Sequence, residues 1–368
     1  MNAPFYEWRI WRRVLLKALI LIVIANVLYL LIQPMDKLRS YSVFGHIFPY
    51  RERLAVPDLD MRPQMISLET LFQSHVISLP KAPDEYRVVV MGDSGANGWG
   101  NADTATISAY LNSAALTLKN RKFRVYNLAH VGTSAMRDLL IGDTALDYQP
   151  DLFVWFVTLQ AFQNIQSVGG LFEANEQRFT RLTARFGLDD VNAQAYGHYE
   201  DTWWQHTLLF ERADIYRWLD FQTYALRQPA YKSVNQKVLQ QAIPTQPVLS
   251  ADDPVLTPMP NATWKALTAM SSLSSVPVLI VNEPILVVPG NTSNYDEWIG
   301  RALYDKYRTT FQGFCNENHL WCLDLWNSLP PTDYSDMPLH HTDEGNALIA
   351  SLVANEIRHF LNKNQLGL

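Results

Sequence analysis

The stretch VVVMGDSGANGWG, Val88–Gly100, decides the fold class of this chain. Four consecutive apolar residues, three of them β-branched, stop at Gly92, which is typical of a buried strand that ends in a turn. Asp93 and Ser94 follow directly, and three more glycines come within six residues of Ser94. Ser94 is therefore either a nucleophile on a sharp strand-to-helix turn or a polar residue in a loop that caps the next helix.

A strand–helix alternation surrounds this turn. We predict strands at 85–91, 123–127, 150–157, 276–282 and 320–325, and helices at 103–116, 136–141, 264–272, 299–312 and 342–362. This order predicts an α/β fold with a parallel sheet and right-handed crossovers. Ligands of such sheets bind beyond the carboxyl ends of the strands, where Ser94, Gly132 and Gln160 each fall.

Two regions depart from the alternation. Residues 165–260 hold an amphipathic helical stretch at 203–226 and a proline-rich tract at 243–260. We interpret them as a helical insertion, which is a lid, a partner surface or a plain helical subdomain. Residues 34–84 are predicted to form a juxtamembrane stalk that partly packs on the domain of residues 85–368.

The N-terminus predicts a membrane anchor. Residues 14–33 form an apolar run of about 20 residues, the length that a helix needs to cross a bilayer. Arg9, Arg12 and Arg13 precede it, so the positive-inside rule places residues 1–13 in the cytoplasm and the remainder outside the cytoplasm of a single-pass protein in the cell membrane. A cleavable signal peptide and a buried core helix are the alternatives.

Composition excludes some classes of function. The 368 residues carry a net charge of −6, with a pI of about 5.8, so no basic surface for nucleic acid is expected. The two cysteines, Cys315 and Cys322, lie seven residues apart and form either a disulfide or two buried thiols. They lack the further ligands that a metal site needs, and we predict neither metal nor cofactor.

Two further motifs carry chemistry. LHHTDEG at 339–345 offers His340 as a general base, with Asp336 four residues before it and other acids in reach. In NLAHVGTS at 127–134, Gly132 allows close approach of the backbone, and its N–H is a natural donor to an oxyanion. A structural histidine and a tight turn are the ordinary explanations of these two motifs.

Together, Gly92-Asp93-Ser94, Asn127 with Gly132, and His340 with Gly345 resemble the SGNH/GDSL esterase family. The resemblance covers roughly residues 85–165 and 262–360. It implies a three-layer α/β/α, flavodoxin-like fold and a Ser94–His340–Asp336 triad. It also implies an oxyanion hole formed by the Ser94 and Gly132 N–H groups with one side-chain amide.

Two departures from the family pattern concern this site. The Gly-x-Asn-Asp block of the family is missing, so Gln160 becomes the candidate for the third oxyanion donor, ahead of Asn164. The family acid commonly lies three residues before the histidine, where this chain has Met337, and Asp336 lies one residue further back.

A fourth loop follows the strand predicted at 276–282. Asn282, Glu283, Tyr295 and Trp298 are candidates for substrate binding because they lie past a strand end. A helix-capping loop explains the same residues equally well.

The anchor and the domain together resemble accessory proteins of D-alanyl-lipoteichoic acid transfer and of alginate or peptidoglycan O-acetylation. The resemblance implies an extracytoplasmic serine esterase or O-acyltransferase that acts on an acyl ester of a cell-envelope glycan or polymer through acyl-Ser94. A membrane-bound O-acyltransferase is the implied partner. The alternatives are an inactive assembly protein of a surface polysaccharide acylation system and a lipid-ester hydrolase.

Overall fold

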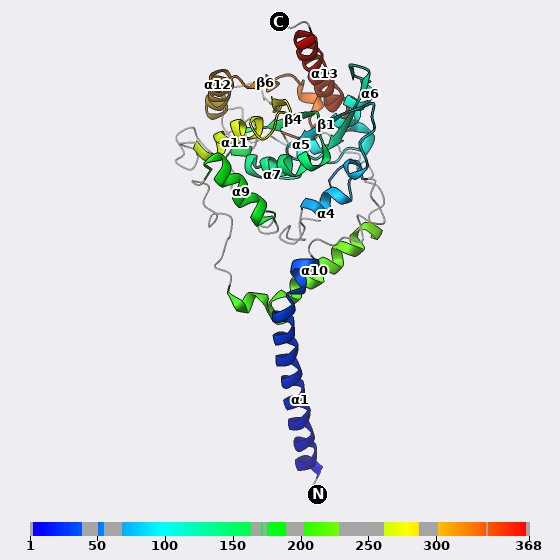
Figure 1. Cartoon of the computed structure of the whole chain (residues 1–368), viewed down its shortest axis with the longest axis vertical. Coiled ribbons are helices and arrows are strands. Elements are labelled where there is room, and N and C mark those ends of the chain that lie inside the picture. Colours follow the sequence, from blue (N-terminus) through cyan, green and yellow to red (C-terminus); the bar gives the residue numbers. More distant parts are fainter. Residues whose placement is uncertain are drawn as a thin grey trace.

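The computed structural model describes residues 3–38, 51–54, 68–162, 171, 175–188, 202–227, 261–286, 301–335 and 338–365. Figure 1 shows a long helix, α1 (Ala3–Ile32), that projects from a domain built on a central sheet. A second long helix, α10 (Leu208–Arg227), crosses the end of α1 between that helix and the sheet domain.

The sheet has six strands in the order β2-β3-β1-β4-β5-β6. Their bounds are β1 Glu85–Met91, β2 Thr117–Leu118, β3 Arg121–Asn127, β4 Leu152–Val157, β5 Val278–Asn282 and β6 Trp321–Asp324. Every neighbouring pair is parallel except β2 with β3. The five parallel strands follow the flavodoxin-like order, and the switch point lies between β1 and β4. The predicted fold class is confirmed.

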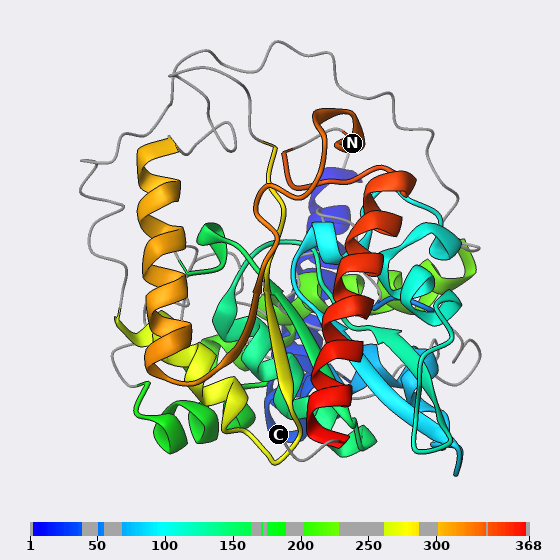
Figure 2. The same ribbon diagram turned by 90° about the horizontal axis from the view of Figure 1, so that it is seen from above.

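Helices cover both faces of the sheet. Alternate residues of β1 point to opposite sides, so Val89 and Met91 belong to one buried cluster and Val88 and Val90 to the other. The first face is covered by α7 (Ala135–Ala145), α11 (Asn261–Ser271) and α12 (Arg301–Glu317), and the second by α6 (Ile107–Ser113) and α13 (Asp343–Gln365). Figure 2 shows α12 and α13 on opposite sides of the sheet. The result is a three-layer α/β/α domain.

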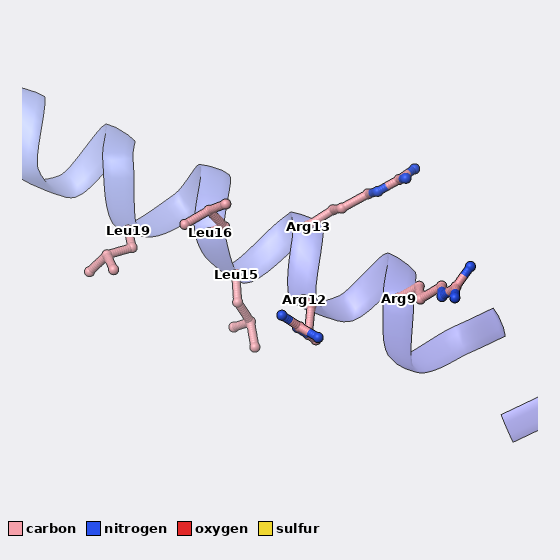
Figure 3. Close-up of a pocket in the computed structure, with 6 residues that line it drawn as sticks. All are labelled: Arg9, Arg12, Arg13, Leu15, Leu16 and Leu19. Atoms are coloured by element: carbon pink, nitrogen blue, oxygen red, sulfur yellow. The ribbon is translucent and has the colours of Figure 1, made fainter. Parts of the chain in front are cut away.

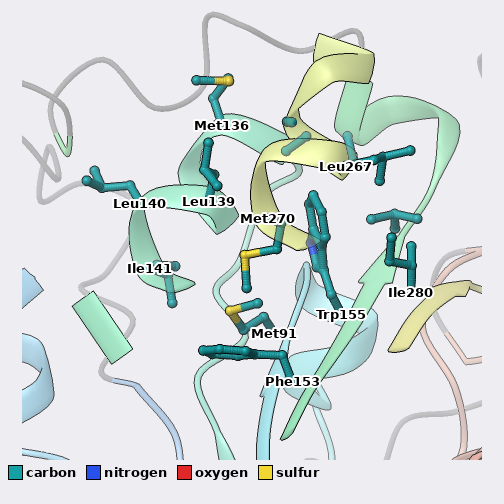
Figure 4. Packing of buried hydrophobic residues seen from close by; sticks show 14 of the residues in the cluster. Met91, Met136, Leu139, Leu140, Ile141, Phe153, Trp155, Leu267, Met270 and Ile280 are labelled. Atoms are coloured by element: carbon teal, nitrogen blue, oxygen red, sulfur yellow. The ribbon is translucent and has the colours of Figure 1, made fainter. Parts of the chain in front are cut away.

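Trp155 of β4 is the largest fully buried side chain on the first face. Figure 4 shows it beside Met270 of α11 and the side chains of α7. Its indole N–H donates to Asp138 Oδ2 at 2.9 Å, so the one polar atom of this ring is satisfied inside the core.

The domain core begins earlier in the chain than the predicted boundary at residue 85. Two elements of the predicted stalk, α4 (Leu68–Gln73) and η2 (Val76–Ser78), pack against the sheet domain. Leu68, Phe72 and Ile77 are fully buried there in the same cluster as Trp155. Arg51 forms an isolated bridge to His75, which precedes η2, and Arg53 forms one to Asn127 of β3. This part of the stalk is therefore an integral layer of the domain.

The remaining elements differ in detail from the prediction. The helix predicted at 103–116 divides into η3 (Asp103–Ala105) and α6, because the Thr106 side chain accepts the Ala109 N–H and starts a new helix. The described part of the insertion contains α9 (Glu176–Phe186), η8 (Trp203–His206) and α10. The proline-rich tract lies outside the described residues.

Helix α1 is long and apolar enough to cross a membrane between Trp8 and Ile32. Its most apolar window of 18 residues has a mean hydropathy of 2.7 and is not buried by the rest of the chain. Figure 3 shows Arg9, Arg12 and Arg13 projecting from the turns that precede Leu15, Leu16 and Leu19. The span begins within the residues predicted to be cytoplasmic, and it ends at Ile32 rather than at residue 33.

Candidate active site

Ser94 opens α5 (Ser94–Asn97), a single helical turn directly after β1. The Asp93 side chain accepts the Gly95 N–H at 2.8 Å, and Gly98 ends the turn in the left-handed region. Gly92 has φ of +146°, and a Cβ there would lie 2.9 Å from the Cβ atoms of Ala96 and Phe156. Only glycine fits this position, so Gly92 permits the sharp turn that presents Ser94.

His340 meets Ser94 at this turn. Its Nε2 lies 2.8 Å from Ser94 Oγ, although the two residues are 246 positions apart. His340 is buried, while Ser94 is half-buried. The hydroxyl therefore has an imidazole partner within hydrogen-bond distance, as nucleophile activation requires.

The loop that carries His340 is held by the Ser94 turn itself. A Cβ on Gly95 would lie 2.5 Å from the Leu339 carbonyl oxygen, so the absence of a side chain at Gly95 allows the loop to approach. Asn101 donates to the His341 carbonyl at 3.2 Å and to Asp343 Oδ1 at 2.8 Å. These contacts fix the backbone on both sides of His340.

The predicted acid of the triad, Asp336, lies outside the described residues and remains a prediction. The neighbouring His341 does not share the position of His340. Its Nε2 lies 3.4 Å from the Pro284 carbonyl, and burial lowers the pKa of His341 to about 4, so the ring is neutral at neutral pH.

Two backbone N–H groups belong to the segments that follow β1 and β3. The N–H groups of Ser94 and Gly132 make no hydrogen bond within the described part of the chain. Gly132 has φ of +88°, which favours glycine. The His130 N–H donates to the Gly92 carbonyl at 3.0 Å and holds the Gly132 loop against the Ser94 turn. The two predicted oxyanion donors therefore lie on adjoining loops.

Gln160, the predicted third donor, is half-buried in η5 (Leu159–Phe162), directly beyond β4. Asn164 lies outside the described residues. The Asn127 side chain donates to the Asn97 carbonyl at 3.2 Å and accepts the Ala129 N–H at 3.1 Å. Asn127 thus joins the end of β3 to the end of α5, and it acts on the backbone of the site.

Arg137 was missed by the sequence reasoning. Its guanidinium is 1% exposed and donates to the carbonyls of Gly92 at 3.0 Å, Val131 at 3.1 Å and Gly132 at 2.5 Å. Asp138 balances its charge at 2.7 Å. One side chain therefore fixes the nucleophile turn and the Gly132 loop together. The signal was the adjacent charged pair Arg137-Asp138 inside a helical stretch, 135–141, whose other residues are apolar.

Arg53 holds the other end of α5 and was also missed. It donates to the carbonyls of Gly98 at 2.8 Å and Asn101 at 3.0 Å and pairs with Asp103 at 2.7 Å. Its own segment bridges to Asn127 of β3. A residue of the predicted stalk thus supports the turn that carries Ser94.

Two buried carboxyl groups lie behind the nucleophile. Glu283 follows β5 and is fully buried, with Oε2 3.4 Å from the position of a Cβ on Gly95. Burial and the adjacent Asp93 raise the pKa of Glu283 well above its usual range. Burial also raises the pKa of Asp93, although the nearby His340 and Arg137 oppose that shift. Both effects favour the neutral form of the Glu283 carboxyl group, whose two oxygens have no hydrogen-bond partner among the described residues.

Asn282 and Glu283, the two described residues among those predicted to bind substrate, are buried and do not form an exposed rim. Asn282 is fully buried, donates to Asp324 Oδ1 at 2.8 Å and accepts the Tyr307 hydroxyl at 3.1 Å. Its amide group thus joins β5 to β6 and α12. Tyr295 and Trp298 lie outside the described residues. The two cysteines form a Cys315–Cys322 disulfide between α12 and β6.

No family model and no curated protein matches the chain. Among solved structures, a putative acylhydrolase from Bacteroides fragilis is 13% identical, covers 78% of this chain and 91% of its own, and has a TM-score of 0.38. A catalytic mutant of an acetylxylan esterase from Geobacillus stearothermophilus is 12% identical, covers 76% and 96%, and has a TM-score of 0.37. At these values the likeness does not bear on the activity of this chain.

Proposed function

We propose that this chain is a membrane-anchored serine ester hydrolase or O-acyltransferase of the SGNH type, with Ser94 as its nucleophile. The observation that supports it best is the 2.8 Å contact between Ser94 Oγ and His340 Nε2 at the carboxyl end of β1. A serine that only caps a helix needs no imidazole from a loop 246 residues away. The free N–H groups of Ser94 and Gly132 supply the second requirement, donors for an oxyanion.

The residues then have defined roles. Ser94 Oγ attacks the acyl carbonyl carbon while His340 Nε2 accepts the hydroxyl proton. The Ser94 and Gly132 N–H groups stabilise the oxyanion, with the Gln160 amide as the proposed third donor. Collapse expels the alcohol, which takes the proton from His340 and leaves acyl-Ser94. Water or a sugar hydroxyl attacks this ester in turn, and the proton returns to Ser94. Asp336 is proposed to hold the imidazole.

The substrate that we propose is an acyl ester of a cell-envelope glycan or polymer outside the cytoplasm. The support is helix α1 with Arg9, Arg12 and Arg13 at its start, which favours an extracytoplasmic domain. An active site tethered to the membrane would lie close to a membrane-bound O-acyltransferase that could donate acyl groups. We therefore favour acyl transfer over hydrolysis.

A fluorophosphonate probe tests the nucleophile. We expect the full-length protein in detergent to be labelled, and we expect Ser94→Ala and His340→Ala to abolish labelling while thermal unfolding stays cooperative. Ser113→Ala is the matched control, because Ser113 is exposed on α6 and should leave labelling unchanged. A folded wild-type protein that takes no label would favour the inactive assembly protein.

The fate of the acyl group separates the reaction types. With an acetyl ester and an envelope oligosaccharide, transfer gives an acetylated oligosaccharide, whereas hydrolysis gives free acetate. Release of fatty acid from lipid vesicles, without acetyl turnover, would favour the lipid-ester hydrolase.

A further inference from the structure

Outside α1, the exposed large apolar side chains of the described residues are concentrated in one place. Among the described residues outside that helix, the exposed large apolar side chains are Trp203, Trp204, Leu209, Phe210, Tyr216, Leu219 and Leu348. Six of these seven lie in the short stretch formed by η8 and the first turns of α10, and their exposed fractions run from 50% to 71%. Such a concentration marks a surface that is covered in use.

The spacing places several of these apolar side chains on one face of α10. Leu209, Ala213 and Tyr216 recur at helical intervals and are all exposed, with Leu219 one turn further along the same side. The opposite side carries Glu211, which is buried at 7% exposure. The exposed face of α10 therefore carries these apolar side chains together with the charged Arg212, while the carboxylate of Glu211 is turned inward.

This face lies at the end of the candidate membrane span. The Leu209 N–H donates to Asn26 Oδ1 of α1 at 3.0 Å, and the Tyr29 hydroxyl donates to Glu211 at 2.6 Å. At 1.5 Å rise per residue, Asn26 lies about 9 Å below Ile32, the last residue of the span. Interfacial helices bury their apolar face about 5–10 Å into the boundary between headgroups and acyl chains. Leu209 thus joins α1 at the depth of such a helix.

We propose that Trp203–Leu219 is an interfacial membrane anchor that lies in the surface of the leaflet from which α1 emerges. Tryptophan and tyrosine suit this depth because their rings are apolar and their N–H and O–H groups reach the polar layer. The inference rests on the proposed membrane anchoring through α1. It adds a second attachment, which restricts rotation of the sheet domain about the α1 axis and fixes the height of Ser94 above the bilayer.

Spin-label accessibility in vesicles tests this anchor. The full-length protein is reconstituted into phosphatidylethanolamine and phosphatidylglycerol vesicles, with nitroxide on single cysteines that replace Phe210 or Tyr216. We expect these labels to collide more with oxygen than with a water-soluble nickel chelate, as labels in lipid do. The matched control is Leu348→Cys on α13, another exposed apolar position, which should favour the chelate.

A label at Leu21 of α1 separates this inference from the anchoring itself. If the Leu21 label is in lipid and the Phe210 and Tyr216 labels are as open to the chelate as the Leu348 label, the interfacial anchor is refuted and the span stands. If the Leu21 label is also in water, the proposed membrane anchoring fails. If the label at position 210 is protected from the chelate in native membranes but not in pure lipid vesicles, a protein partner covers this face and the proposed lipid contact is overturned.

Discussion

Replacing Gly95 with alanine should slow acylation of Ser94 about 100-fold while the protein stays folded. The new Cβ would lie 2.5 Å from the Leu339 carbonyl oxygen. A carbon–oxygen contact of about 3.3 Å requires the two segments to separate by about 0.8 Å. Leu339 precedes His340, so this separation lengthens the 2.8 Å contact from Nε2 to Ser94 Oγ. A misplacement of about 1 Å costs about 10²-fold in rate.

The assay is the rate of fluorophosphonate labelling, with hydrolysis of p-nitrophenyl acetate as a second readout and thermal unfolding as the check on the fold. Gly313→Ala in α12 is the matched control, because no atom lies within 4 Å of its added Cβ and alanine favours a helix by about 1 kcal/mol. A wild-type labelling rate for folded Gly95→Ala would refute the argument that the close approach of the His340 loop sets the reactive geometry.

Three further predictions concern buried ionisable side chains. Arg137→Lys should lower the free energy of unfolding by about 2 kcal/mol and reduce turnover, because one ammonium group cannot replace the guanidinium that donates to both the Gly92 and the Gly132 carbonyls. Urea unfolding measures the first effect and ester hydrolysis the second, and unchanged values would contradict this role of Arg137. The pKa of Glu283 is raised well above 4.5, so the folded chain keeps a proton that the unfolded chain loses, and the free energy of unfolding falls as pH rises above 4.5. Glu283→Gln should show a shallower fall in urea unfolding across this range, and parallel curves for the two proteins would contradict the raised pKa. Burial lowers the pKa of His75 from 6.5 to about 4, so between these pH values the unfolded chain binds a proton that the folded chain does not. About 3 kcal/mol of stability is therefore lost as pH falls from 6.5 to 4. His75→Gln should remove that loss, and an unchanged midpoint of acid unfolding would contradict the lowered pKa.

The fold was predictable because its signals are local. Runs such as Val88–Val90 end at a glycine, and the alternation of strands and helices limits the topology to a few arrangements. The pairing of Ser94 with His340 was accessible for the same reason, since both motifs lie past strand ends that meet at one edge of the sheet. The structure brings them together at 2.8 Å.

The support around the site was not predictable. Arg53 and Arg137 donate to backbone carbonyls. Every residue has a backbone carbonyl, so the sequence does not show which of them an arginine will bind. Glu283 was expected at a rim because it follows a strand, yet the chain turns it inward behind Gly95. The helix of the insertion was predicted, but its contact with Asn26 of α1 depends on a tertiary arrangement that periodicity does not encode.

The anchoring of Arg53 to α5 also determines where a soluble fragment can start. A truncation at residue 85, the first residue of β1, would remove the guanidinium that donates to Gly98 and Asn101. It would also remove Leu68, Phe72 and Ile77 and expose the apolar surface that they cover. A fragment that begins before Arg51 keeps both. For crystallisation or screening, the useful cut therefore lies between the end of α1 and Arg51, on the membrane side of the segment that supports the nucleophile.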